Sequence, residues 1–125
     1  MDNLINKKIK QKSKVLNKMS AIKVHSGGMD VFATPMMIAK MEKASHDLLS
    51  KLVPNKQNVG YIVNIRHLAP IGIGKVFYTE SIITDVEGVK ITFATKCYDE
   101  NGVVFGKGTH VRVLVDENDF KNKIL

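Results

Sequence analysis

One amphipathic segment constrains the fold of this chain more than any other: "TPMMIAKMEKASHDLLSKLV", residues 34–53. When each residue is placed at about 100° per step, Met37, Met41 and Leu48 fall on one arc and the lysines fall on the opposite arc. Pro54 follows, at the place beyond a helix end where proline is common. The spacing therefore predicts one long helix with a single buried face.

After this segment, residues 58–115 change to an alternation of period two, which is typical of half-buried strands. The side chains that share a phase are Val59, Tyr61, Val63, Ile65 and His67, then Val89, Ile91, Phe93 and Cys97, and last Val111, Val113 and Val115. The stretches "DVEG" and "DENG" have the Asp, Asn and Gly residues of hairpin turns. A single helix followed by antiparallel strands has to bury its apolar face against the sheet. We therefore predict one α+β domain, residues 1–125, in two layers.

Residues 1–24 form a basic arm that supplies most of the net charge of +7. Lysines at 8, 10, 12 and 14 alternate with Ile9, Gln11, Ser13 and Val15, which suits a first strand with its lysines in solvent. A basic segment can bind phosphate backbones. This one has no arginine and no aromatic residue on which bases could stack, so nucleic acid is not the expected partner.

The rest of the composition favours an ordinary cytoplasmic protein. No apolar run approaches the ~20 residues of a membrane span, and the start of the chain has no apolar signal core. The single Cys97 cannot build a disulfide framework, and the four histidines lack metal-ligand spacing. We expect no membrane partner, no metal and no cofactor. Because a small sheet leaves open edges that are usually paired, we expect a homodimer, with further association left open.

Three residues are candidates for chemistry. Thr34 precedes Pro35 and suits the N-cap of the helix, yet a helix start also offers N–H groups and a positive dipole end to a developing oxyanion. Glu42 borders the buried arc of the helix, where it either acts as a partly desolvated acid or pairs with His46 one turn on. His67 extends the apolar phase of its strand, either as a core residue or as a partner for an acid on the facing helix.

Three blocks of the sequence, "VFATPMMIAKMEKA", "NVGYIVNIRHLAP" and "GKGTHVRVLV", together resemble the hot-dog-fold thioesterases, and among them the group around fluoroacetyl-CoA thioesterase. The resemblance runs from about residue 28 to 115. It implies a central helix wrapped by an antiparallel sheet, a dimer with active sites at the subunit interface, and hydrolysis of acyl-CoA thioesters, with CoA entering as part of the substrate. By motif, it assigns catalysis to Thr34, Glu42 and His67, and substrate binding to Phe32, Gly60 and Arg112.

The chain departs from that group at two places. Residues 26–30 are "SGGMD", where the resemblance calls for a second aromatic residue over the substrate, and Lys43 stands where a tryptophan follows the acid. We therefore expect a short or small acyl-CoA as the substrate rather than a fluorinated one. The alternative is a hot-dog module that binds acyl-CoA or another apolar ligand without catalysis, because a fold alone does not establish activity.

Overall fold

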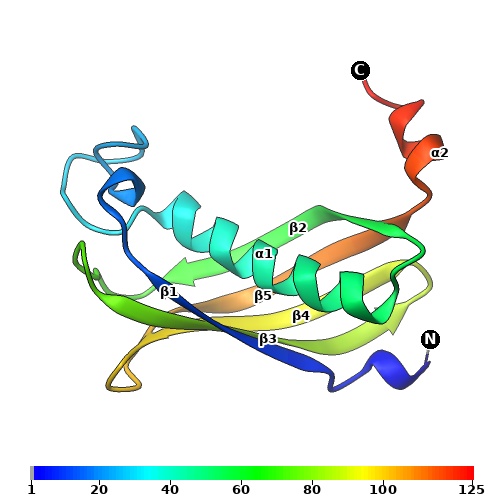
Figure 1. Ribbon diagram of the computed structural model, residues 1–125, viewed down its shortest axis with the longest axis horizontal. Coiled ribbons are helices and arrows are strands. Elements are labelled where there is room, and N and C mark those ends of the chain that lie inside the picture. Colours follow the sequence, from blue (N-terminus) through cyan, green and yellow to red (C-terminus); the bar gives the residue numbers. More distant parts are fainter. Residues whose placement is uncertain (1) are drawn as a thin grey trace.

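The computed structural model describes residues 2–125. Its one long helix, α1 (Thr34–Leu52), lies across one face of a five-stranded antiparallel sheet (Figure 1). This is the two-layer α+β fold that the sequence predicts. Within the described residues, no helix is both long enough and apolar enough to cross a membrane.

The sheet has the strand order β1-β3-β4-β5-β2, so β1 and β2 are its edges. Its strands are β1 (Lys8–Lys14), β2 (Gln57–His67), β3 (Val76–Glu87), β4 (Lys90–Asp99) and β5 (Val104–Val115). Three short helices complete the chain: η1 (Asp2–Leu4), η2 (Asn17–Met19) and α2 (Glu117–Lys121). Helix α2 projects away from the two layers, near the end of β5 (Figure 1).

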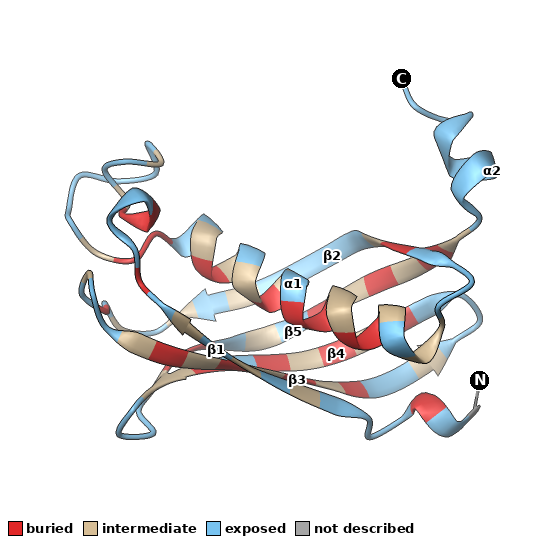
Figure 2. Ribbon diagram, in the orientation of Figure 1, coloured by how far each residue is buried: buried red, intermediate tan, exposed pale blue. Residues whose placement is uncertain are grey.

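The core lies between α1 and the sheet, where the buried residues of both layers face each other (Figure 2). One cluster surrounds Met37 and Met41 and includes three phenylalanines, and a second surrounds Leu48 and Leu49. Cys97 is fully buried in the first cluster, and burial raises the pKa of its thiol to about 11, so it packs rather than reacts. Val89, which the alternation places with the buried residues of β4, is instead 53% exposed in the turn before that strand.

Strand β2 contains a bulge that the simple alternation misses. Gly60 pairs with Arg112 and Ile62 with Val111, so Tyr61 is an extra residue between them. The bulge reverses which residues face α1: Asn58 and Gly60 do so before it, and Val63, Ile65 and His67 after it. The prediction that Val59 and Tyr61 share the phase of His67 is therefore wrong.

The two edges of the sheet differ in character. The lysines of β1 are exposed and its intervening residues are half-buried, which protects this edge against pairing with another chain. Strand β2 instead exposes Tyr61, Ile62 and Val63, a run of large apolar side chains. Within residues 2–125, the β2 edge is thus both unpaired and apolar.

Candidate active site

The start of α1 differs from the predicted cap. The N-cap residue is Ala33, which makes no side-chain capping bond, and Thr34 is already the first residue of the helix. The prediction that Thr34 caps the helix is therefore wrong. Its hydroxyl shares a hydrogen bond with His67 instead, with Oγ1 and Nδ1 2.8 Å apart. The loss of the capping role leaves this hydroxyl available to the site.

His67 is the last residue of β2 and its ring is half-buried beside Phe105. Burial lowers the pKa of His67, and the backbone of Ala69 opposes this by favouring the charged ring. The Nε2 atom is buried and has no hydrogen-bond partner within the described chain. When Nδ1–H donates to Thr34, Nε2 is a free base, which is what proton transfer requires.

A pocket of about 330 Å³ opens beside this pair. Phe32, Thr34 and His67 line it together with Ala21, Ser26, Val31, Leu68, Ala69 and Pro70. Phe32 is 1% exposed, and its ring also packs on Phe77 at a centroid distance of 5.0 Å. Three of the six residues that the sequence singles out therefore meet at one pocket, with Phe32 fixed by the core behind it.

Glu42, Gly60 and Arg112 form a second cluster. Nη1 of Arg112 lies 3.4 Å from Oε2 of Glu42, and the Arg112 side chain is largely buried. A Cβ at position 60 would lie 2.6 Å from the same Oε2, so glycine is what allows the carboxylate to lie against β2. Burial lowers the pKa of Arg112, and Glu42 opposes this, yet an arginine remains charged in proteins. The carboxylate therefore lies beside a fixed positive charge.

Asn58 completes this cluster, and the sequence did not single it out. Its Oδ1 accepts a 2.6 Å hydrogen bond from Nε of Arg112, and its carbonyl oxygen accepts a 3.1 Å bond from Nη2. Its amide in turn donates to Oγ of Ser50 on α1 at 3.3 Å. Asn58 faces α1 only because of the bulge in β2, so the one signal that could have revealed it is the glycine at position 60.

The two clusters are separated along α1. Thr34 and Glu42 are eight residues apart, which is roughly 12 Å of helix. Among the hydrogen bonds and ion pairs of residues 2–125, none joins Glu42 to His67 or to His46. The contact that the sequence suggests between Glu42 and His67 is thus not made within one chain.

A further polar cluster lies deeper in the core. Oγ of Ser45 lies 2.7 Å from Nε2 of His110 and donates to Ser81, which donates to Thr95. Burial and the charge of Arg112 lower the pKa of His110 to about 4. All four side chains are buried, so this is a structural link between the layers. No group of His, Cys, Asp and Glu residues in the described chain could hold a metal ion.

A five-stranded antiparallel sheet wrapped on one long helix defines the hot-dog fold, and solved structures agree. The fluoroacetyl-CoA thioesterase FlK matches with a TM-score of 0.88 at 20% identity, over 95% of this chain and 93% of that one. A thioesterase superfamily member from Thermus thermophilus matches with 0.88 at 20%, over 98% and 91%. A hot-dog-like protein from Thermanaerovibrio acidaminovorans matches with 0.85 at 19%, over 95% and 88%. The chain is therefore a hot-dog-fold protein.

The family is more specific than the fold. The model of the fluoroacetyl-CoA-specific thioesterase family matches residues 15–118, so this chain belongs to that family. The resemblance drawn from the three sequence blocks is confirmed, and so is the predicted activity class, an acyl-CoA thioesterase. No match was found among curated protein sequences.

Proposed function

We propose that this thioesterase hydrolyses a short or small acyl-CoA, with Glu42, His67 and Thr34 at the reacting centre. The observation that carries the proposal is the placement of the Glu42 carboxylate, which lies against Gly60 and 3.4 Å from the buried guanidinium of Arg112. A module that only bound an apolar ligand would have no use for a partly exposed carboxylate that is held in place by a buried arginine.

The chemistry follows from what thioester hydrolysis needs. Glu42 either takes a proton from water as the water adds to the carbonyl carbon, or attacks that carbon itself and is released by water afterwards. In both routes negative charge develops on the carbonyl oxygen, where backbone N–H groups at Gly60 or at the start of α1 can stabilise it. The C–S bond then breaks. The thiolate of CoA takes up the proton that water loses, which passes to it through the free Nε2 of His67, with Thr34 orienting the ring.

The size of the pocket supports a small acyl group. About 330 Å³ beside Thr34 and His67 is at the lower end of small-molecule sites. A mutant of FlK has been solved with fluoroacetate and CoA. In this chain, residues 26–30 contain two glycines and no aromatic residue, so we propose a small acyl group without a requirement for fluorine.

We also propose a cytoplasmic homodimer in which two β2 edges pair antiparallel. The exposed Tyr61, Ile62 and Val63 support this edge as the interface. A two-fold axis near these residues would place the Gly60 end of one β2 opposite the His67 end of the other. Each Glu42 would then approach the Thr34–His67 pair of the second chain, and the two separated clusters would form one composite site.

The proposal is tested by measuring thiol release from acyl-CoAs of increasing chain length, for the native protein and for Glu42→Ala. We expect Glu42→Ala to lower kcat by at least ~100-fold on the best substrate. Glu87→Ala, which removes an exposed acid at the end of β3, is the matched control and should leave kcat unchanged. Equal rates for native protein and Glu42→Ala would refute the catalytic assignment. Tight acyl-CoA binding without hydrolysis would instead favour the binding module.

A further inference from the structure

A row of charged residues crosses the face of the sheet that points away from α1. Each strand contributes one residue to this row. In the order β1, β3, β4, β5 and β2, the paired residues are Lys10, Glu80, Lys96, Lys107 and Arg66. Residues paired in this way share a face and lie about 5 Å apart. Lys96, Lys107 and Arg66 are therefore direct neighbours on three adjacent strands.

None of these three cations forms an ion pair in the part of the chain that the structure describes, although Lys96 lies opposite Glu80 in the cross-strand pairing. The ion pairs within residues 2–125 are Lys43–Asp47, Glu42–Arg112 and Glu117–Lys121, and none involves this row. The one acid of the row, Glu80, accepts a hydrogen bond from the hydroxyl of Tyr98. Like charges directly opposite each other destabilise a sheet, so Lys96, Lys107 and Arg66 repel one another. The Tyr98 ring, 5.6 Å from Nζ of Lys96, and the neighbouring Glu80 offset only part of this cost.

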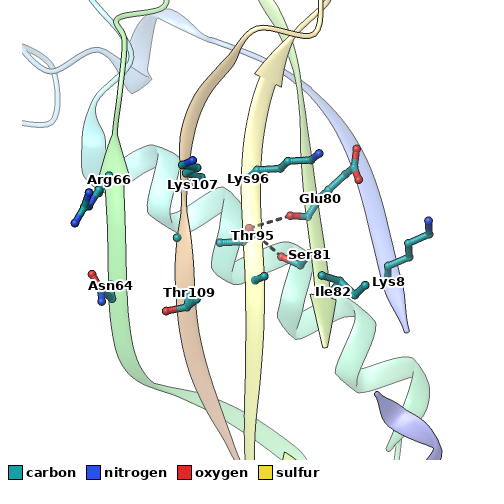
Figure 3. A pocket seen from close by; sticks show the side chains of 12 residues that line it. Lys8, Asn64, Arg66, Glu80, Ser81, Ile82, Thr95, Lys96, Lys107 and Thr109 are labelled. Carbon is teal, nitrogen blue, oxygen red and sulfur yellow. Dashed lines mark hydrogen bonds between the residues drawn. The ribbon is translucent and has the colours of Figure 1, made fainter. Parts of the chain in front are cut away.

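A hollow lies next to the row on the same face (Figure 3). The neighbouring cross-strand row consists of Lys8, Ile82, Ala94, Thr109 and Asn64. Because Ala94 and the adjacent Gly108 are small, this row leaves a groove of about 640 Å³ that Lys96, Lys107 and Arg66 also line. The groove thus combines a partly apolar floor with a cationic side, because Lys8, Arg66, Lys96 and Lys107 outnumber the one acid of the lining, Glu80.

We propose that this groove binds a small organic phosphate with two or more phosphate groups, such as a nucleoside polyphosphate. The phosphates would lie along Lys96, Lys107 and Arg66, where the planar guanidinium of Arg66 can bind two phosphate oxygens at once. The organic part would lie over Ile82 and Ala94. A volume of about 640 Å³ is that of a small-molecule site.

The groove is independent of the thioesterase site. It shares no lining residue with the pocket at Thr34 and His67, and α1 lies behind the sheet when the groove is viewed from the front (Figure 3). A second copy of the chain is a poorer occupant, because two such faces would bring their cations together and like charges across an interface are unfavourable. A multiply charged anion relieves the repulsion instead.

Isothermal titration calorimetry with inorganic tripolyphosphate and with ATP, at one fixed salt concentration, tests this proposal. The groove variant is Arg66→Gln, Lys96→Gln and Lys107→Gln combined. The control is Lys51→Gln, Lys56→Gln and Lys123→Gln, which removes the same charge from exposed lysines outside the groove. We expect the groove variant to bind at least ~10-fold more weakly than the native chain and the control to bind within ~2-fold. The double variant Lys96→Arg with Lys107→Arg keeps the charge and should keep the affinity.

The outcomes separate the ligand sources. If ATP binds more tightly than tripolyphosphate, the nucleoside also contacts the groove. If the two affinities are equal, the groove recognises the phosphate chain alone. Equal weakening in the groove and control variants would overturn the proposal, because binding would then follow net charge. If neither tripolyphosphate nor ATP binds at about 1 mM, the proposal is also overturned. An oligonucleotide that binds more tightly than both probes would overturn it as well. A melting curve for each variant verifies that it is folded.

Discussion

Asn58 accepts a 2.6 Å hydrogen bond from Nε of Arg112, and both side chains are buried. The carbonyl oxygen of Asn58 accepts a second bond from the same guanidinium. Together the two bonds orient the arginine so that its remaining terminal nitrogen, Nη1, points at Glu42. The position of the candidate catalytic acid therefore depends on a residue that is itself held by Ser50 on α1.

Replacing Asn58 by alanine removes the side-chain acceptor and leaves a buried charged donor unpaired. We expect the free energy of unfolding to fall by about 1.5–3 kcal/mol, since the bond is to a charged group. We also expect kcat for folded enzyme to fall while KM changes less, because Glu42 loses its fixed partner. Urea denaturation and steady-state kinetics measure the two effects. Asn55→Ala, at an exposed position after α1, is the control, and an unchanged kcat in Asn58→Ala would limit Asn58 to a structural role.

The sequence predicted the elements of this fold better than their faces. The segment forms α1 over residues 34–52, with Val53 as its C-cap, because its apolar residues recur at helical spacing and nothing in the tertiary structure opposes that pattern. Strand β2 is different, because the extra Tyr61 reverses its phase and brings Asn58 and Gly60 to the helix side. In β5 the regular valines, 111, 113 and 115, are only half-buried, while His110, Arg112 and Leu114 are buried. Hydrophobic alternation cannot predict a buried polar face.

The candidate site was predictable in its members but not in its contacts. Thr34 suits an N-cap by residue type, yet its hydroxyl bonds to His67, because the end of β2 lies beside the start of α1 and offers a ring nitrogen. The helical spacing predicts Glu42 at the border of the buried arc, and its side chain is 36% exposed. Its partner Arg112 lies 70 residues away in the sequence. No local pattern reports a contact over that separation.

The Thr34–His67 pair predicts how activity depends on pH. Burial favours the neutral ring and lowers the pKa of His67 below its ordinary 6.5. Protonation of the His67 ring removes the free base at Nε2. We therefore expect kcat/KM to fall only below pH 6.5, where the ring becomes protonated. Thr34→Val removes the hydroxyl and should lower kcat/KM by about 10-fold or more, whereas Thr34→Ser should keep most of it. An acidic limb centred above pH 6.5, or equal rates in the two variants, would contradict this assignment.

His110 makes stability depend on pH. Its pKa is about 4 in the folded chain and 6.5 ordinarily, so between these values the unfolded chain binds more protons and acid favours unfolding. The contribution of neutral His110 to the free energy of unfolding is fully present above pH 6.5 and is lost as the pH falls toward 4. Between pH 7 and pH 5 the loss is about 2 kcal/mol. His110→Gln should flatten this dependence in urea denaturation series. His25→Asn, at an exposed position, should reproduce the native slope, and a native-like slope in His110→Gln would refute the assignment.

A composite site across two β2 edges has a consequence that a site within one chain does not. Glu42→Ala and His67→Ala are each expected to be inactive, but a refolded equal mixture should regain about a quarter of native activity, since half of the dimers are mixed and one of their two sites is intact. Val63→Lys, which places a charge on the exposed β2 edge, should abolish both this recovery and the dimer in sedimentation analysis. Val103→Lys, in an exposed turn, should abolish neither. Recovery fails if Glu42 and His67 of the same chain react together, and the two separated clusters would then need another explanation.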